Sequence, residues 1–237
     1  MTGAPSRSAA LHLKLSFATP ALNTAMANLW RPEGLTRRYG RYLRTMHEVI
    51  RASVPLMELA ARRCAELGPD DPVAGPLAAY LAEHIEEERG HDDWLLADLA
   101  AAGLDPRGPL RQQPPPVVAR LVGPQYYWIE HFHPVALLGY ITVLESNAPA
   151  PWLAEQLAAD TGLPGAAFQT VSHHAVLDTG HSAELARFID RLPLDPAQET
   201  AIAVSALHTV NAATELFNRI ALGDLNTPSR AERTPDQ

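Results

Sequence analysis

Residues 84–91 read HIEEERGH, and residues 174–181 read HAVLDTGH. Both octets contain a histidine, a carboxylate four positions later, a glycine, and a closing histidine. On a helix that turns by about 100° per residue, the two histidines and the carboxylate of each octet lie on one stripe. Apolar residues continue both stripes, so the sequence predicts that the two polar triplets face the core of a helical protein.

These two triplets are candidate metal ligands. Ionisable side chains that face an apolar interior are costly unless a partner neutralises them. Imidazole and carboxylate together form a ligand set that suits iron, manganese or zinc. Two matching octets favour metal binding, and the alternative is a pair of histidine–carboxylate hydrogen bonds that join two helices. The candidates are His84, Glu88 and His91 in the first octet, and His174, Asp178 and His181 in the second.

A further carboxylate is expected at the same site. The segment HFHPVALLGYITVLESNAP (131–149) carries Glu145 at the end of a strongly apolar run, and we interpret it as bound with the octets. Gly90 and Gly180 each precede a closing histidine. A glycine inside a helix costs about 1 kcal/mol relative to alanine, so we expect the close approach of a facing helix or of a ligand at both positions.

The rest of the chain also reads as helix, because apolar residues recur at steps of three and four. We expect one helical bundle over residues 20–222, a flexible segment over 1–19 and a disordered tail over 223–237. A kink or break is expected near Pro55. The expected helices span 20–30, 35–67, 75–102, 114–122, 125–147, 150–161, 164–190 and 195–221.

The composition of the chain excludes several classes of function. The chain has 237 residues and a formal net charge of -8, which leaves no basic surface for a nucleic-acid partner. Cys64 is the only cysteine, so no intramolecular disulfide or CxxC pair can form. No segment reads as a secretion signal or as a membrane span. We expect a protein of the reducing cytoplasm that does not enter the membrane.

Other candidate motifs carry less chemistry. His47 and Glu48 begin like the zinc-protease motif HExxH, but Arg51 stands where the second histidine should be. No Walker loop, GxGxxG or GxSxG is present, which excludes the usual nucleotide and serine-hydrolase sites. Aromatic and basic side chains at helical spacing are candidates for a substrate pocket, although such residues more often belong to a core or a solvated face. They are Arg44, His47, Tyr127, Trp128, His133 and Tyr140.

Three stretches together resemble a known family. They are EEERGHDDWLLADLAAAGLDP (86–106), LESNAP (144–149) and HHAVLDTGHSAELARF (173–188). With these stretches the chain, over roughly residues 35–220, resembles the heme-oxygenase-like diiron oxidases and oxygenases, also called iron-containing redox enzymes. The His-x3-Asp-x2-His pattern of the third stretch is the most specific part of the resemblance.

The resemblance implies an all-α, heme-oxygenase-like up-and-down bundle of about seven helices that holds two Fe(II) ions. It also implies the activation of O2 toward a small molecule such as an amino acid, an amine or a fatty acid. In this family pattern, His91 and an upstream carboxylate hold one iron and Glu145 bridges. The second octet then completes the ligand set.

One position departs from the family pattern. Many members carry a glutamate seven residues before the first-helix histidine, where this chain has His84. Either Glu88 takes that role or the first iron site gains an additional nitrogen ligand.

Other functions stay open on this fold. One is a metal-free enzyme of the TenA or PqqC kind, and another is a heme-degrading oxygenase with His47 as an axial ligand. A binding protein without enzymatic activity is a further alternative. The ligand set also suits manganese, and the fold favours a homodimer.

Overall fold

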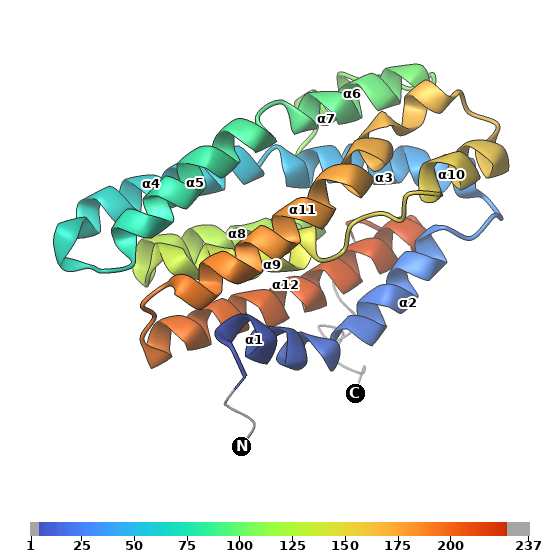
Figure 1. Cartoon of the computed structure of the whole chain (residues 1–237). Helices are drawn as coiled ribbons and strands as arrows, with labels where there is room; N and C mark the ends of the chain where they lie inside the picture. Colours follow the sequence, from blue (N-terminus) through green and yellow to red (C-terminus); the bar gives the residue numbers. More distant parts are fainter. Residues whose placement is uncertain (1–4, 227–237) are drawn as a thin grey trace, which may run out of the picture.

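The computed structural model describes residues 5–226, except for the side chains of Asp178 and Thr179. All regular structure in this part is helical (Figure 1), which confirms the all-α prediction. Short 3-10 helices are η1 (Gly68–Asp70), η2 (Pro134–Ala136) and η3 (Gly165–Phe168). The α-helices are α1 (Arg7–Ser16), α2 (Thr19–Leu29), α3 (Leu35–Ile50), α4 (Ser53–Leu67), α5 (Ala74–Glu88), α6 (His91–Ala101), α7 (Gly108–Arg111), α8 (Pro116–His131), α9 (Leu137–Glu145), α10 (Leu153–Thr161), α11 (Gln169–Arg191) and α12 (Pro196–Leu222).

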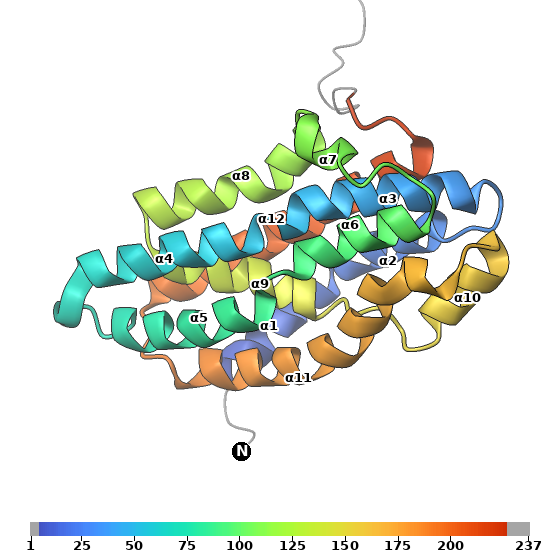
Figure 2. The same cartoon turned by 90° about the horizontal axis from the view of Figure 1, so that it is seen from above.

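The helices in this part of the chain outnumber the expected seven, because several expected long helices are divided by a break. Two consecutive helices on either side of such a break form a rod. Figure 2 shows two of these rods side by side, one formed by α3 and α4 and the other by α5 and α6. The chain reverses direction between α4 and α5, so α4 packs against α5 and α3 packs against α6. The two breaks therefore lie at the same level of the paired rods.

The break in the first rod is close to the expected one. α3 ends at Ile50, and Pro55 lies in the first turn of α4, where the missing N–H of proline needs no partner.

The break in the second rod corrects the prediction of a continuous helix over 75–102. α5 ends at Glu88, and Gly90 has a left-handed backbone with φ of 86°. A Cβ added at Gly90 or at Gly180 would meet no atom within 4 Å, so the expected close approach of a facing helix is wrong at both positions. Gly90 is needed for its positive φ, which other residues rarely adopt.

The break before α9 lies at Pro134, where a proline favours a helix boundary, and not in the gap between the expected helices 114–122 and 125–147. Pro124 lies inside α8, and the chain breaks at Phe132–His133 instead. Proline disfavours the helical conformation of the residue that precedes it. His133, which precedes Pro134, is accordingly extended. The His133 ring accepts a hydrogen bond from the Val135 N–H at 3.0 Å and donates one to Asp71 Oδ2 at 3.1 Å. His133 therefore ties this break to the turn before α5.

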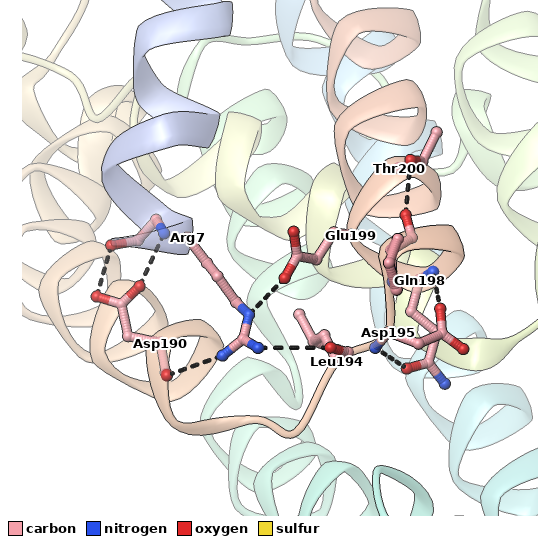
Figure 3. Close-up of polar contacts among 9 residues, drawn as sticks. Arg7, Asp190, Leu194, Asp195, Gln198, Glu199 and Thr200 are labelled. Atoms are coloured by element: carbon pink, nitrogen blue, oxygen red, sulfur yellow. Dashed lines mark hydrogen bonds and ion pairs between the residues drawn. The ribbon is translucent and has the colours of Figure 1, made fainter. Parts of the chain in front are cut away.

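Within the segment 1–19, for which the sequence predicts flexibility, residues 7–16 form the helix α1. Leu11 and Leu15, one helical turn apart, are buried on one face of α1, which packs against α11 and α12. The Ser8 N–H and hydroxyl both donate to Asp190 at 2.8 Å, and Arg7 pairs with Glu199 at 2.6 Å (Figure 3). The pattern of the sequence did not predict this helix, because polar residues interrupt its apolar positions.

Replacing Asp190 by alanine is expected to lower the free energy of unfolding at pH 7 by about 1–2 kcal/mol, because two hydrogen bonds to α1 are lost. Burial favours a higher pKa for Asp190, but the hydrogen bonds from Ser8 and the charge of Arg7 outweigh burial and lower it. This contribution to stability is present above the unfolded pKa of about 3.9 and is lost as pH falls through the lower folded pKa.

Thermal unfolding of the wild type and the variant between pH 7 and pH 2.5 checks this. The difference in Tm should shrink toward the acid end. Asp160→Ala, at an exposed position of α10, is the matched control and should behave like the wild type. An Asp190→Ala variant with an unchanged Tm at pH 7 would show that α1 contributes little to stability.

The buried apolar side chains form two clusters along the rods. One surrounds α4, α5, α8, α9 and α12, and the other surrounds α3, α6, α10 and η3. Along the second rod, Ile85 belongs to the first cluster and Leu95 to the second. The polar residues of the first octet, Glu88 and His91, therefore lie between the two apolar clusters.

α9 and α12 cross at very short range. A Cβ on Gly139 would come within 2.2 Å of the Ile202 carbonyl oxygen and 2.7 Å of the Ala206 backbone nitrogen. The two helices therefore touch through their backbones, with only the glycine between them. This contact fixes the depth of α9 in the bundle and with it the position of Glu145 at the end of α9.

α12 ends at Leu222, and the left-handed Gly223 follows it. The expected disordered tail over 223–237 lies outside the described residues from 227 onward. None of the helices within residues 5–226 has the length and apolar character that crossing a bilayer requires.

Candidate metal centre

The two octets differ in secondary structure. The first is divided by the break: His84 and Glu88 lie on α5, whereas His91 is the first residue of α6. The second lies entirely within α11, which contacts both α6 and α9. Residues that are far apart in the sequence therefore meet at the break in the second rod. The expectation that both octets are uninterrupted helix is correct only for the second.

One group of side chains gathers around His84. This histidine is 5% exposed, and its Nε2 lies 3.0 Å from Glu145 Oε1. Its Nδ1 lies 3.4 Å from Glu87 Oε2, and the same oxygen lies 3.6 Å from His181 Nε2. Ligand atoms of His84, Glu87 and His181 all lie within 4.8 Å of one another, which is the spacing that a shared metal ion requires.

Glu87 was not among the residues that the sequence indicated. Its side chain is 50% exposed, and its position in the sequence lies off the apolar stripe that continues through His84, Glu88 and His91. It reaches His84 because residues three apart on a helix are neighbours, and it reaches His181 because α11 passes beside it. The run EEE at 86–88 was the only signal, and spacing alone does not say which of its carboxylates turns inward.

A second group lies on the other side of the break. His91 Nδ1 is 3.2 Å from Glu88 Oε2, and the rings of His91 and His174 are 5.2 Å apart. The His174 Nδ1–H donates to the Thr170 carbonyl at 2.9 Å, which leaves Nε2 with a free lone pair. Trp94 stacks on His91 at 4.0 Å and holds the plane of its ring.

Asp178 lies on α11, between His174 and His181 in sequence. Its side chain lies outside the described residues, so its expected role as a ligand stays a prediction.

The charges in the centre shift one another's pKa values. Burial works against protonation of His84, but the contact with Glu145 and the charges of Glu88 and Glu87 outweigh it and raise the His84 pKa. Burial works against ionisation of Glu88, yet the nearby histidines, His91 foremost, lower the Glu88 pKa. For His174 burial dominates and lowers the pKa, which favours the neutral form that binds metal.

The residues present fit a metal centre. Neither carboxylate oxygen of Glu145 makes a hydrogen bond, although Oε1 lies close to His84. The Nδ1 atom of His181 is also buried without a hydrogen-bond partner, and Nδ1 of His91 is buried with Glu88 Oε2 at 3.2 Å but makes no well-directed hydrogen bond. Buried polar atoms normally have partners, so poorly satisfied ligand atoms in both groups indicate cations. Imidazole and carboxylate are ligands that iron and manganese both accept.

A cavity of about 170 Å³ lies beside the centre. His84, Glu88, Glu145 and His174 contribute to its wall, and most of the remaining lining is apolar. A smaller pocket of about 20 Å³ lies on the other side of His84, where Glu87 and His181 also line it. His84 therefore stands between the cavity and the smaller pocket.

Of the residues expected in a substrate pocket, Tyr140 lines this cavity. The side chain of Tyr127 is 63% exposed, His47 is buried outside the cavity, and His133 binds Asp71. These residues do not line this cavity, because helical spacing does not indicate which face of α3 or α8 turns toward it. The residues outside the cavity lining are Arg44 and His47 on α3, Tyr127 and Trp128 on α8, and His133 before η2.

A protein family described as iron-containing redox enzymes matches residues 59–214. The match covers more than half of the chain and contains both octets and Glu145. The chain belongs to the iron-containing redox enzyme family. The resemblance found in the sequence is thereby confirmed, and within the iron-containing redox enzyme family iron is the metal that the description names.

Solved structures show the fold of this member of the iron-containing redox enzyme family. A domain of unknown function from Shewanella denitrificans, described as having a heme oxygenase-like fold, matches with a TM-score of 0.69 at 16% identity, over 90% of this chain and 88% of that one. A TenA homolog from Pseudomonas syringae matches with a TM-score of 0.69 at 12% identity, over 94% and 98% of the two chains. A CADD-like protein of unknown function from Nostoc punctiforme matches with a TM-score of 0.62 at 16% identity, over 90% and 100%. No curated protein matches the chain. The fold is heme-oxygenase-like, as the sequence predicted.

Proposed function

We propose that the protein is a non-heme diiron oxidase or oxygenase that uses O2 to oxidise a small molecule. The observation that carries the proposal is the set of buried imidazole and carboxylate atoms without hydrogen-bond partners beside an apolar cavity. Membership of the iron-containing redox enzyme family supports iron as the metal. A reducing cytoplasm is the proposed location, consistent with the buried free thiol of Cys64.

Glu145 is the carboxylate best placed to be shared between two ions. It contacts His84, whose group includes Glu87 and His181, and it lines the cavity together with Glu88 and His174. We propose that one ion would be held by the residues on each side of Glu145. His91 joins the side of Glu88, and Asp178 joins from its position between the two histidines of α11.

When bound, two ferrous ions supply the electrons with which O2 is reduced. The protein's own groups set the conditions for that chemistry. The hydrogen bond from His174 to the Thr170 carbonyl fixes the tautomer that presents Nε2, and Trp94 restrains the His91 ring. The apolar wall of the cavity limits the access of water to the reacting molecule.

Metal analysis and oxygen uptake test this proposal. Protein purified without chelator and reconstituted with ferrous iron under anaerobic conditions should bind about two irons per chain, as two-metal sites do. On exposure to air, the ferrous protein should consume O2, and treatment with EDTA should abolish the uptake. Full activity after EDTA treatment would instead support a metal-free enzyme of the TenA kind, a function that the TenA-homolog fold also accommodates.

A matched set of variants sharpens the test. The double variant His174→Ala, His181→Ala should lose most of its iron and its O2 uptake. His173→Ala removes the neighbouring histidine, which is exposed and packs against Trp94, and it should keep the iron content of the wild type. Equal iron content in all three proteins would place the metal elsewhere.

Heme degradation is disfavoured by the same cavity. His47 does not line it, and neither lysine nor arginine is present among its described lining residues to pair with the two heme propionates. Addition of hemin should therefore produce no Soret band of a ligated heme.

A further inference from the structure

The cavity beside the metal centre has two chemically distinct ends. At one end are His84, Glu88, Glu145 and His174, the proposed metal ligands. Away from this end the walls come mainly from α2, α3, α4, α9 and α12 and are mostly apolar. Typical members of this wall are Leu22, Val49, Leu56, Leu216 and Phe217. A molecule that fills the cavity must therefore be apolar over most of its length.

Methionine is concentrated in this wall. The sequence contains four methionines, and Met26, Met46 and Met57 all line the cavity. Methionine side chains are unbranched and flexible, so they adapt to ligands of varied shape. The wall therefore suits a flexible chain better than one rigid ring system.

The charges of the lining exclude a second charged group on the ligand. Neither lysine nor arginine occurs among the described lining residues, and the carboxylates there belong to the metal centre. A zwitterionic amino acid that fills the cavity would bury at least one charge without a partner, which costs several kcal/mol. Such a substrate does not match the cavity.

Two neutral hydroxyl groups of the lining have no hydrogen-bond partner, that of Thr170 in the first turn of α11 and that of Tyr140. Tyr140 is 2% exposed, lines the cavity, and its hydroxyl has no hydrogen-bond partner. Burial raises the pKa of Tyr140, so the hydroxyl keeps its proton and can act as a donor. An acceptor atom on the head of a ligand would satisfy it.

We propose that the cavity binds an aliphatic molecule with a single hydrogen-bond-accepting head, the head at the metal centre and Tyr140, and the chain along the methionine wall. The length follows from volume: because an apolar cavity of about 150 Å³ holds benzene, the present one suits a chain of about six to eight carbon atoms. The inference names the substrate class of the proposed oxidase and rests on that function for its reaction, but binding itself needs no metal.

Binding of a 1-alkanol series to the metal-free protein tests the inference. Isothermal titration with 1-butanol, 1-hexanol and 1-octanol should show Kd falling by about fourfold per added methylene. The gain should stop beyond about eight carbons, when the cavity is full. The amino acid 2-aminooctanoate, which has the same chain but two charges, should bind at least about 30-fold more weakly than 1-octanol, because the lining offers no lysine or arginine to pair with its carboxylate.

Variants distinguish the contribution of the cavity wall from that of the hydrogen bond to the head of the ligand. Ala213→Leu adds bulk to the wall, so the longest chain accepted should become shorter, and Met46→Ala should make it longer. Because Met46 is only partly buried, its variant also serves if Ala213→Leu does not fold. Ala100→Leu, the same change at an exposed position of α6, should leave the series unchanged. Tyr140→Phe should weaken every alcohol by about fivefold, the value of one hydrogen bond, and leave the dependence on chain length intact.

The outcomes distinguish this inference from the proposed function. Affinity that does not depend on chain length, or equal binding of the amino acid, overturns the inference even if the protein binds iron and consumes O2. A clear chain-length series in a protein that takes up no iron would leave the aliphatic site standing and would overturn the oxidase.

Discussion

Glu145→Gln is expected to lose at least one of the two metal ions and to lower O2 uptake by at least about 100-fold. Glutamine keeps the size of the side chain but removes the charge that two cations would share. Glu145 is the only proposed ligand supplied by α9, so no neighbouring carboxylate of that helix can replace it. Iron content and anaerobic metal titration of the variant check the first part, and an oxygen electrode checks the second.

The same variant has a signature in stability that does not depend on turnover. A ligand that binds only the folded state stabilises it, by about 2.7 kcal/mol at a concentration 100 times Kd. For a chain of this size that corresponds to a rise in Tm of roughly 5–10 °C. The wild type should show this rise with Mn(II), which avoids oxidation, and Glu145→Gln should show little or none.

Glu155→Gln, at an exposed position of α10, is the matched control and should respond to the metal like the wild type. A Glu145→Gln variant that still binds two ions and gains the full Tm shift would remove Glu145 from the ligand set. The assignment of one ion to each side of Glu145 would then be wrong.

Gly139→Ala is expected to be among the most destabilising single substitutions in the chain, with a loss of about 3 kcal/mol or more. The new methyl group would meet the backbone of α12 at Ile202 and Ala206, which cannot rotate away as a side chain can. α9 and α12 would have to separate along their crossing. Chemical denaturation gives the loss directly, and expression without soluble protein would point in the same direction.

Gly180→Ala is the natural counterpart of this substitution. Gly180 lies within α11, and a Cβ there would meet no atom within 4 Å. Alanine is the better helix former, so this variant should be as stable as the wild type or up to about 1 kcal/mol more stable. If both glycine variants lost stability equally, close backbone contact would not be the reason for Gly139.

The sequence predicted those parts of the fold whose signals are local. α12 is found nearly where its pattern placed it, since Asp195 and Gln198 form a capping box at its start and Gly223 follows its end. The break at Gly90 was not predicted because a glycine within an apolar period looks the same whether the helix continues or turns. Its positive φ is visible only in three dimensions.

The sequence predicted most of the residues of the candidate site, but not which of them contact one another. The octets indicated inward histidines, and the structure places His84 and His91 within the bundle. Spacing along one helix could not show that Glu145 would lie against His84, because that contact depends on how α9 crosses α12. Nor could it find Glu87, whose partner on α11 comes from the other octet.

Gly90 also affects how substitutions in this protein should be interpreted. Glu88 is the last residue of α5 and His91 is the first of α6, so the backbone torsions of Arg89 and Gly90 set the separation of two proposed ligands. The joint belongs to the centre as much as its donor atoms do. A substitution at Gly90 would leave a folded protein that fails to bind its metal. An assay of folding alone would not detect this defect.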